Sequence, residues 1–317
     1  MYFSGLKKNK MYIEQLQKFK INLWTYLVIP VLFLGLMVYN YISTEGVDTA
    51  SMINEMNKMI GVNGTFVMLV SPLAFMLLIV LFYNKFIQNN TLRILTTSRS
   101  KIDWKRVLFS FGLWSLFTIV TTVISYYAAP EDFVMNFKPK EFAVFVVLAL
   151  LLIPLQTSFE EYLFRGHMLQ GLGLATKTRW IPLIVTSFLF GIMHIANPEV
   201  EKLGMVIMFY YIGTGLFLGI LTLMDEGLEL ALGFHAANNL VGALLVTSDW
   251  SAFQTHSILK DVSEPSANFQ IFIPILIIFP ILLYIFAIKY KWSNWKEKLF
   301  GTIKPIEIDN LESIGKD

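Results

Sequence analysis

The chain has 317 residues, of which 55% are hydrophobic and 15% charged, with a mean hydropathy of +0.59; soluble domains carry about 25% charged residues, so a soluble globular enzyme is excluded. The 25 Lys and Arg residues nearly balance the 23 Asp and Glu residues, and a net charge of +2 gives no electrostatic reason to expect a nucleic-acid partner. Because the chain has no Cys, disulfides, thiolate nucleophiles and Cys-ligated metal sites are excluded, and any chemistry must use His, carboxylates, hydroxyls or amides.

Apolar segments follow one another along the chain, each about long enough to cross a hydrocarbon core of ~30 Å as a helix. They are eight in number, at approximately 23–42, 66–88, 108–129, 141–170, 180–197, 205–223, 228–248 and 270–289. The alternation at every second residue that a membrane β-barrel requires is absent from the sequence. The sequence therefore predicts an all-α, polytopic integral membrane protein with about eight transmembrane helices.

The distribution of Lys and Arg indicates the orientation of this protein in the membrane. Twenty of the 25 lie on one side of the predicted spans, which is the side of both chain ends. Since cytoplasmic loops carry the excess of Lys and Arg, both termini are predicted to be cytoplasmic in a multi-pass protein of the cell membrane. Asp225, Glu226 and Glu229 make one loop on this side acidic, but acidic residues contribute little to the rule.

Ionisable groups at membrane depth are costly and indicate function by default. The fourth segment contains Glu160, Glu161 and, four residues further on, Arg165. Glu161 and Arg165 have the favourable i,i+4 order for an ion pair on a helix. Glu160 points about 100° away from Glu161 and has no cation of its own in the segment. On these residues alone, both acids could equally mark the end of the span in the cytoplasmic headgroups.

Two further segments carry polar side chains in apolar surroundings. In the fifth segment His194 is the only ionisable group, and Gly191 permits another backbone to come close. In the seventh segment His235 and Asn239 are at i,i+4 and face the same way. Ordinary packing and interhelical hydrogen bonds are the alternative explanation for each of these side chains.

Depth in the membrane favours a shared site. If the fourth helix ends at the Gly-Leu-Gly sequence at 171–173, Glu160 lies ~16 Å from its cytoplasmic end, at about 1.5 Å per residue. By the same rise, His194 lies ~21 Å from the cytoplasmic start of its helix, and His235 and Asn239 lie ~11 and ~17 Å from theirs. Unrelated packing residues would have no reason to fall in one layer.

Three motifs, in this order on three membrane helices, resemble those of the CPBP intramembrane proteases: Glu160-Glu161-x-x-x-Arg165, Phe190-x-x-x-His194 and His235-x-x-x-Asn239. This family includes the type II CAAX prenyl endopeptidases (Rce1-like), the bacterial Abi proteins and bacteriocin-processing or immunity proteins. The resemblance covers about 141–248, and no motif position departs from the family's pattern.

The resemblance implies hydrolysis of a peptide bond inside the membrane, CAAX-protease-like in mechanism. Glu160 and His194 would hold and deprotonate a water molecule, with Glu160 as the general base. His235 and Asn239 would stabilise the tetrahedral oxyanion, and a donor aimed at such a charge is worth ~3 kcal/mol in comparable sites.

Other residues would support these four. The resemblance implies that Glu161 and Arg165 form a structural pair that orients the helix. His167 lies seven residues after Glu160, on nearly the same helical face, and we interpret it as a supporting partner of that acid. Phe190, which opens the second motif, is expected beside the site.

The family is often described as metalloproteases, and a metal-free glutamate mechanism has also been proposed for it. Glu160, His194, His235 and a water molecule could complete a catalytic zinc shell. The His-Glu-x-x-His motif of zinc proteases is nevertheless absent, and Asn239 in place of a third strong ligand suits an oxyanion donor better. The favoured mechanism therefore requires no cofactor, with zinc as the alternative.

The expected partners are membrane lipids and a membrane-associated or lipidated peptide substrate, without nucleic acid. We divide the chain into membrane helices one to three (1–140), the CPBP catalytic core (141–248), and a loop, last membrane helix and cytoplasmic tail (249–317). A non-catalytic immunity or scaffold protein of the same fold is the main alternative, although such a protein would be expected to have lost a motif residue. A transporter is less favoured, because the sequence has no inverted repeat and no matching pair of broken helices.

Overall fold

The computed structural model of the chain describes residues 11–18, 22–44, 46–266 and 268–304. Its α-helices are α1 (Thr25–Ser43), α2 (Thr49–Ile60), α3 (Val62–Phe86), α4 (Leu92–Thr96), α5 (Trp104–Ala128), α6 (Pro139–Glu161), α7 (Leu169–Thr176), α8 (Trp180–Ile192), α9 (Pro198–Leu203), α10 (Ile207–Asp225), α11 (Glu229–Leu245), α12 (Phe279–Tyr290) and α13 (Trp295–Phe300). Short 3₁₀ segments are η1 (Glu14–Lys18), η2 (Pro130–Asp132) and η4 (Phe269–Phe272), and π-helical segments are η3 (Tyr162–Met168) and η5 (Pro274–Ile278).

Three short strands form a small sheet at one end of the helices. They are β1 (Phe133–Met135), β2 (Val246–Thr247) and β3 (Leu259–Asp261), in the order β1-β3-β2. β1 pairs antiparallel with β3, with Val134 opposite Lys260, and β2 pairs parallel with β3. The sheet therefore joins the loop that precedes α6 to the chain that follows α11.

Six helical segments of the described chain are long and apolar enough to cross a membrane: Thr25–Ser43, Val62–Phe86, Trp104–Ala128, Pro139–Thr176, Ile207–Asp225 and Phe269–Tyr290. The predicted all-α, polytopic membrane fold is confirmed, but the count of eight spans is not. Two predicted spans are shorter helices, since α8 has 13 residues and α11 has 17. α8 ends at Ile192 because the chain turns there, and α11 carries several polar residues.

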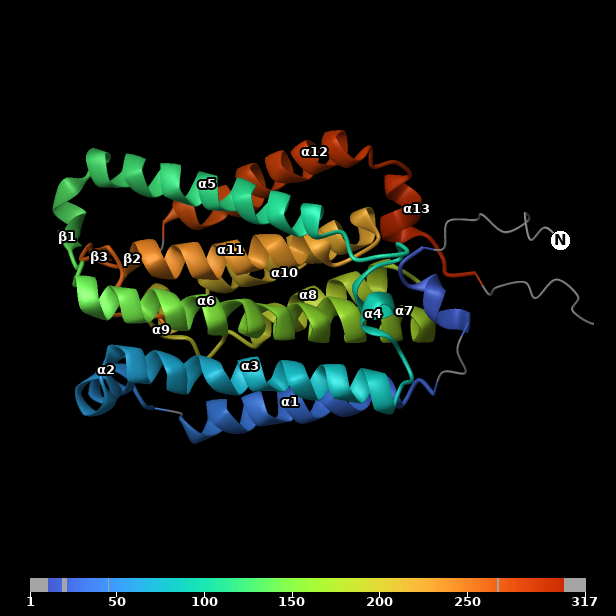
Figure 1. Ribbon diagram of the computed structural model, residues 1–317, viewed down its shortest axis with the longest axis horizontal. Coiled ribbons are helices and arrows are strands. Elements are labelled where there is room, and N and C mark those ends of the chain that lie inside the picture. Colours follow the sequence, from blue (N-terminus) through green and yellow to red (C-terminus); the bar gives the residue numbers. More distant parts are fainter. Residues whose placement is uncertain (1–10, 19–21, 45, 267, 305–317) are drawn as a thin grey trace, which may run out of the picture.

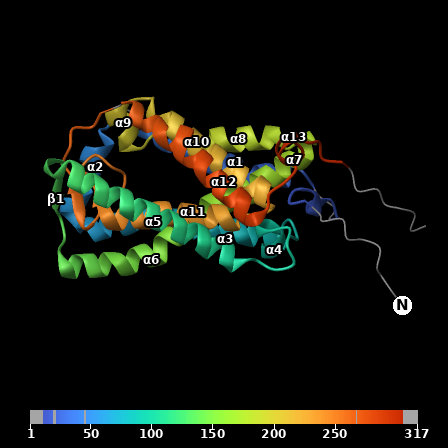
Figure 2. The same ribbon diagram turned by 90° about the horizontal axis from the view of Figure 1, so that it is seen from above.

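Figure 1 shows the long helices side by side along the long axis of the molecule. The strands, α2 and α9 lie at one end, and α4, α7 and α13 lie at the other. α11 packs against α5 and α6, whereas α8 packs against α10. Figure 2 shows α8 and α10 on one side of the bundle and α5 and α6 on the other. α8 also packs against η3, the segment that continues α6, so the end of α6 lies between α8 and α11.

Glycines let some of these segments approach closely. A Cβ atom at Gly191 would lie 2.3 Å from Cγ1 of Ile212, so the close backbone approach predicted there is present between α8 and α10. Gly171 does not end its helix, which continues to Thr176, so the predicted stop at 171–173 is wrong. A Cβ at Gly171 would lie 2.4 Å from the ring of Tyr26, and close packing explains this glycine instead.

The acidic loop between α10 and α11 is neutralised by buried ion pairs. Asp225 accepts hydrogen bonds from Arg99 and Arg106, and from Nε1 of Trp292 at 3.1 Å. Nη1 of Arg99 also lies 3.1 Å from Oε2 of Glu229. Asp225 and Glu229 thus each have a basic partner nearby, and the orientation of the chain in the membrane stays a prediction from the Lys and Arg distribution.

Candidate active site

Residues of the three motifs lie near one another at the end of α6 and in η3, beside α11 and the end of α8. Glu160 and Glu161 are the last two residues of α6, and both are buried. His235 is buried on the facing side of α11, and Asn239, one turn further on, is partly exposed. His194 follows the end of α8 and is also partly exposed. The site is therefore closed around its acids and more open at His194 and Asn239.

Glu161 joins two of the motifs through one oxygen atom. Its Oε1 accepts a hydrogen bond from Nη1 of Arg165 at 2.9 Å, so the i,i+4 contact that the sequence predicts is present. The same Oε1 lies 2.7 Å from Nδ1 of His235, which must be the donor to an ionised carboxylate. Nη2 of Arg165 also donates to the carbonyl oxygen of Gly215 at 3.0 Å. One fully buried ion pair thus connects α6, α10 and α11.

Glu160 faces the other nitrogen of the same imidazole. Its Oε2 lies 3.6 Å from Nε2 of His235 and has no hydrogen-bond partner in the described part of the chain. Its Oε1 accepts a hydrogen bond from Nε2 of Gln156, one turn earlier on α6. The carboxyl is therefore held by one oxygen, and the other is directed at the imidazole of α11.

His194 lies in a turn rather than on the predicted helix, which ends two residues before it. Its Nδ1 is 2.8 Å from the carbonyl oxygen of Phe190, and because a carbonyl only accepts, Nδ1 carries the hydrogen. In the neutral ring Nε2 is then the free acceptor. The ring stacks on Tyr211 with centroids 4.4 Å apart, which fixes its plane.

Phe190 packs against several of the motif residues, as the sequence predicts for a residue beside the site. Its ring centroid lies 5.1 Å from that of His194 and 5.8 Å from that of His235. The guanidinium carbon of Arg165 lies 4.2 Å from the same ring, within the range of a cation–π contact. This phenyl ring therefore separates the ion pair from the more open imidazole and holds both in place.

Asn239 reaches the first motif through the amide of Gln156, which belongs to none of the three motifs. Its Nδ2 donates to Oε1 of Gln156 at 3.3 Å, and its Oδ1 accepts from Nδ2 of Asn238 at 3.1 Å. Gln156 precedes Glu160 by four residues, so the i,i+4 rule applied to that acid could have identified it. Tyr211 gives no such signal, because no spacing relates it to His194.

His167 lies elsewhere, although it was expected beside Glu160. Its ring stacks on Tyr26 with centroids 4.9 Å apart, and its Nδ1 lies 3.4 Å from Oδ1 of Asn84. The expectation assumed α-helical geometry between residues 160 and 167. Residues 162–168 form the π-helical segment η3, which turns through a smaller angle per residue and carries His167 to a different face.

The described residues do not fit the zinc shell considered for Glu160, His194 and His235. No three His, Asp or Glu side chains in these ranges converge as a metal site requires. His235 directs its two nitrogens at two different carboxyls, and His194 uses Nδ1 on a backbone carbonyl. The arrangement therefore offers no shared position for a metal ion among the described residues.

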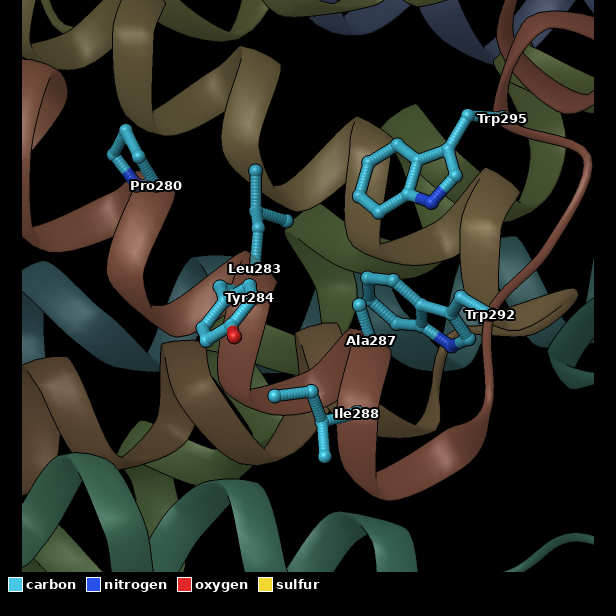
Figure 3. Close-up of a pocket in the computed structure, with 7 residues that line it drawn as sticks. All are labelled: Pro280, Leu283, Tyr284, Ala287, Ile288, Trp292 and Trp295. Carbon is cyan, nitrogen blue, oxygen red and sulfur yellow. The ribbon is translucent and has the colours of Figure 1, made fainter.

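An apolar groove of about 510 Å³ lies away from these residues, on α12 and the segment that follows it. Figure 3 shows its lining, which includes Tyr284, Trp292 and Trp295. Tyr284 is 66% exposed on the outside of the bundle. Tyr and Trp are enriched where proteins meet the membrane–water interface, and the lining of this groove has that composition and none of the motif residues.

Comparison with known proteins supports the resemblance drawn from the motifs. Residues 139–241 match the family Type II CAAX prenyl endopeptidase Rce1-like. The predicted resemblance is thereby confirmed over this range, which extends from the start of α6 to beyond Asn239. The match is to a family of peptidases, and together with the apolar helices it indicates a multi-pass membrane protein.

One curated relative extends the similarity beyond this range. The chain is 30% identical over 194 residues to "Uncharacterized protein YyaK" of Bacillus subtilis (strain 168). The aligned residues make up 61% of this chain and 65% of that relative. No solved structure matches the chain.

Proposed function

We propose that this protein is an intramembrane endopeptidase that hydrolyses a peptide bond of a membrane-associated or lipidated substrate. The observation that carries the proposal is the free Oε2 of Glu160, buried and 3.6 Å from Nε2 of His235. A buried carboxylate oxygen without a hydrogen-bond partner is costly unless it has a use, and taking a proton from a water molecule is one. Lipids surround such a site, and its substrate reaches it from the membrane.

The first step is attack by water on the carbonyl carbon of the scissile bond. Nε2 of His194 accepts one hydrogen bond from the water, and Glu160 takes the other proton as the oxygen–carbon bond forms. The carbonyl π electrons move to the oxygen, which becomes the oxyanion of a tetrahedral intermediate. General-base help of this kind contributes about 10²- to 10⁴-fold to a rate.

The second step breaks the carbon–nitrogen bond. A hydrogen on Nε2 of His235 and an N–H of Asn239 stabilise the oxyanion, and Glu161 compensates the charge on the imidazole from its Nδ1 side. The intermediate collapses, and Glu160 returns its proton to the departing amine. The products are a carboxylic acid, which keeps the second hydrogen of the water and loses it to solvent on release, and an amine terminus; the glutamate recovers its starting state.

The protein reconstituted in liposomes tests this proposal. The probe is a mixture of farnesylated and non-lipidated peptides, and mass spectrometry detects new peptide termini. We expect the wild type to cleave peptide, and we expect the cleavage rate to fall by at least about 100-fold in Glu160→Gln and in His194→Ala. Thermal unfolding curves check that both variants are folded. The matched control is Glu201→Gln, because Glu201 is an exposed acid of α9.

Four results would each contradict a part of the proposal. Wild-type protein that leaves both classes of peptide intact would remove the peptidase assignment. Turnover retained in Glu160→Gln would remove the base assignment.

A chelator is added in a parallel reaction, and inhibition that zinc reverses would overturn the metal-free mechanism. Labelling of both ends of the chain from the outside of intact cells would contradict the cytoplasmic location that we propose for the termini from the Lys and Arg distribution.

A further inference from the structure

A row of hydrogen bonds leads from an indole on α5 to the catalytic acid on α6. Nε1 of Trp114 donates to Oδ1 of Asn238 at 3.1 Å, and Nδ2 of Asn238 donates to Oδ1 of Asn239 at 3.1 Å. Nδ2 of Asn239 then donates to Oε1 of Gln156 at 3.3 Å, and Nε2 of Gln156 donates to Oε1 of Glu160. The row therefore passes through three helices and ends at the site.

The direction of these bonds is determined by the two ends of the row. An indole nitrogen is only a donor, and an ionised carboxylate is only an acceptor. Each amide between them offers one oxygen and one NH₂ group, so turning over any one amide would place two donors or two acceptors against each other. The chemistry of Trp114 and Glu160 thus orients all three amides without reference to their surroundings.

We infer that Trp114, Asn238 and Gln156 are positioning residues that decide which polar atoms Asn239 and Glu160 present to the substrate. This inference rests on the proposed function of the site. The oxygen of Asn239 is occupied by Asn238 and one of its N–H groups by Gln156, which leaves the second N–H free. Asn239 therefore faces an oxyanion as a donor and never as an acceptor.

The same row determines how Glu160 is used. Gln156 occupies Oε1, and Oε2 is left without a hydrogen-bond partner in the described ranges. Since Gln156 bonds to both Glu160 and Asn239, one amide connects the base to the oxyanion donor. Reversing this amide would place its oxygen against the carboxylate and its NH₂ against the NH₂ of Asn239, which is repulsive at both ends.

Two substitutions separate this role from packing. Trp114 stacks on Phe117 and contacts Phe234, so Trp114→Phe keeps an aromatic ring and removes the donor. Asn238→Asp keeps the shape and still accepts from Trp114, but it cannot donate to Asn239. The matched control is Trp104→Phe, because Trp104 is on the same helix and 64% exposed.

In the liposome assay, we expect Trp114→Phe and Asn238→Asp to lower kcat about 3- to 10-fold, the effect of losing one uncharged hydrogen bond. KM should stay within about twofold, because the row acts on the reacting groups rather than on substrate binding. Trp104→Phe should behave as the wild type. An unchanged kcat in both row variants, with an active wild type, would overturn the inference and leave the proposed function intact.

A second measurement does not depend on activity. The ¹⁵N-labelled indole resonances are recorded in detergent micelles, and the signal of Trp114 is the one that Trp114→Phe removes. We expect this signal to shift in Gln156→Leu, although Gln156 is three hydrogen bonds away, because bonds in a row polarise one another. The signal of Trp104 should not move. A Trp114 signal that is the same in Gln156→Leu and in the wild type would overturn the inference even if no peptide is cleaved.

Discussion

Oε1 of Glu161 lies 2.7 Å from Nδ1 of His235, a residue 74 positions further along the chain. The same oxygen pairs with Arg165, so the second acid of the first motif connects α6 to α11 rather than ending a span in the headgroups. Neither Glu161 nor Arg165 is exposed. Removing one partner of a buried ion pair leaves the other charge buried without compensation, which lowers the stability of the fold.

We expect Glu161→Gln to lower the free energy of unfolding by about 3–5 kcal/mol, because it leaves the Arg165 charge buried without compensation. Thermal unfolding in detergent, followed by Trp fluorescence, measures the change. Glu55→Gln is the matched control, since Glu55 is 67% exposed in its own ion pair with Lys58, and exposed pairs contribute little. Equal unfolding curves for the two variants would show that the buried pair carries no stability.

The Glu161–Arg165 contact could be predicted because it depends only on helical spacing. The cost of polar groups in a membrane and the order of the motifs also predicted that the motif residues lie near one another. The position of His194 could not be predicted from the sequence. Apolar residues continue past Ile192, but the helix ends at that residue and the chain turns. Hydropathy reports burial and cannot show where a helix ends.

Other features depend on local geometry that no periodicity encodes. The π-helical segment η3 changes the face of every later residue, and His167 therefore contacts Tyr26 instead of Glu160. Asp225 looked like an exception to the charge rule because its partners are distant in sequence: Arg99 precedes α5 and Arg106 lies in its first turn. Contacts between distant segments become visible only when the helices are placed.

The proposed oxyanion donor gives a kinetic prediction. We expect Asn239→Ala to lower kcat by about 10²- to 10³-fold, the usual cost of removing one donor to an oxyanion, with KM nearly unchanged. Peptide cleavage in liposomes measures both constants. Asn40→Ala is the control, because Asn40 is exposed on α1 and should leave both constants as in the wild type. A rise in KM alone would instead assign Asn239 to substrate binding.

Glu199, outside the membrane-spanning segments, gives a prediction about pH. Burial raises the pKa of its carboxyl, although the backbone N–H of Ala252 donates to Oε1 at 2.9 Å and partly opposes the rise. Because the folded state then binds the proton more tightly than the unfolded state, this group's contribution to stability is lost as the pH rises from the unfolded pKa towards the folded one.

Unfolding midpoints measured from about pH 5 to about pH 7 test this dependence. Glu199→Gln keeps an oxygen for Ala252 and removes the charge, so we expect it to flatten the pH dependence and to exceed the wild type in stability near pH 7. Glu201→Gln is the control on the same helix and is exposed. A Glu199→Gln protein with the same slope as the wild type would contradict the assignment.

The close packing of α8 against α10 gives a prediction about stability. A Cβ atom at Gly215 would lie 2.6 Å from the carbonyl oxygen of Ser187, so Gly215→Ala must move one helix away from the other. We expect a loss of about 1–3 kcal/mol in stability, as for other overpacked contacts. Activity should fall as well, because the carbonyl of Gly215 accepts a hydrogen bond from Arg165. Gly112→Ala is the control, since nothing lies within 4 Å of its added Cβ. If Gly215→Ala retains wild-type stability and turnover, as Gly112→Ala is expected to do, the close contact at Gly215 contributes to neither.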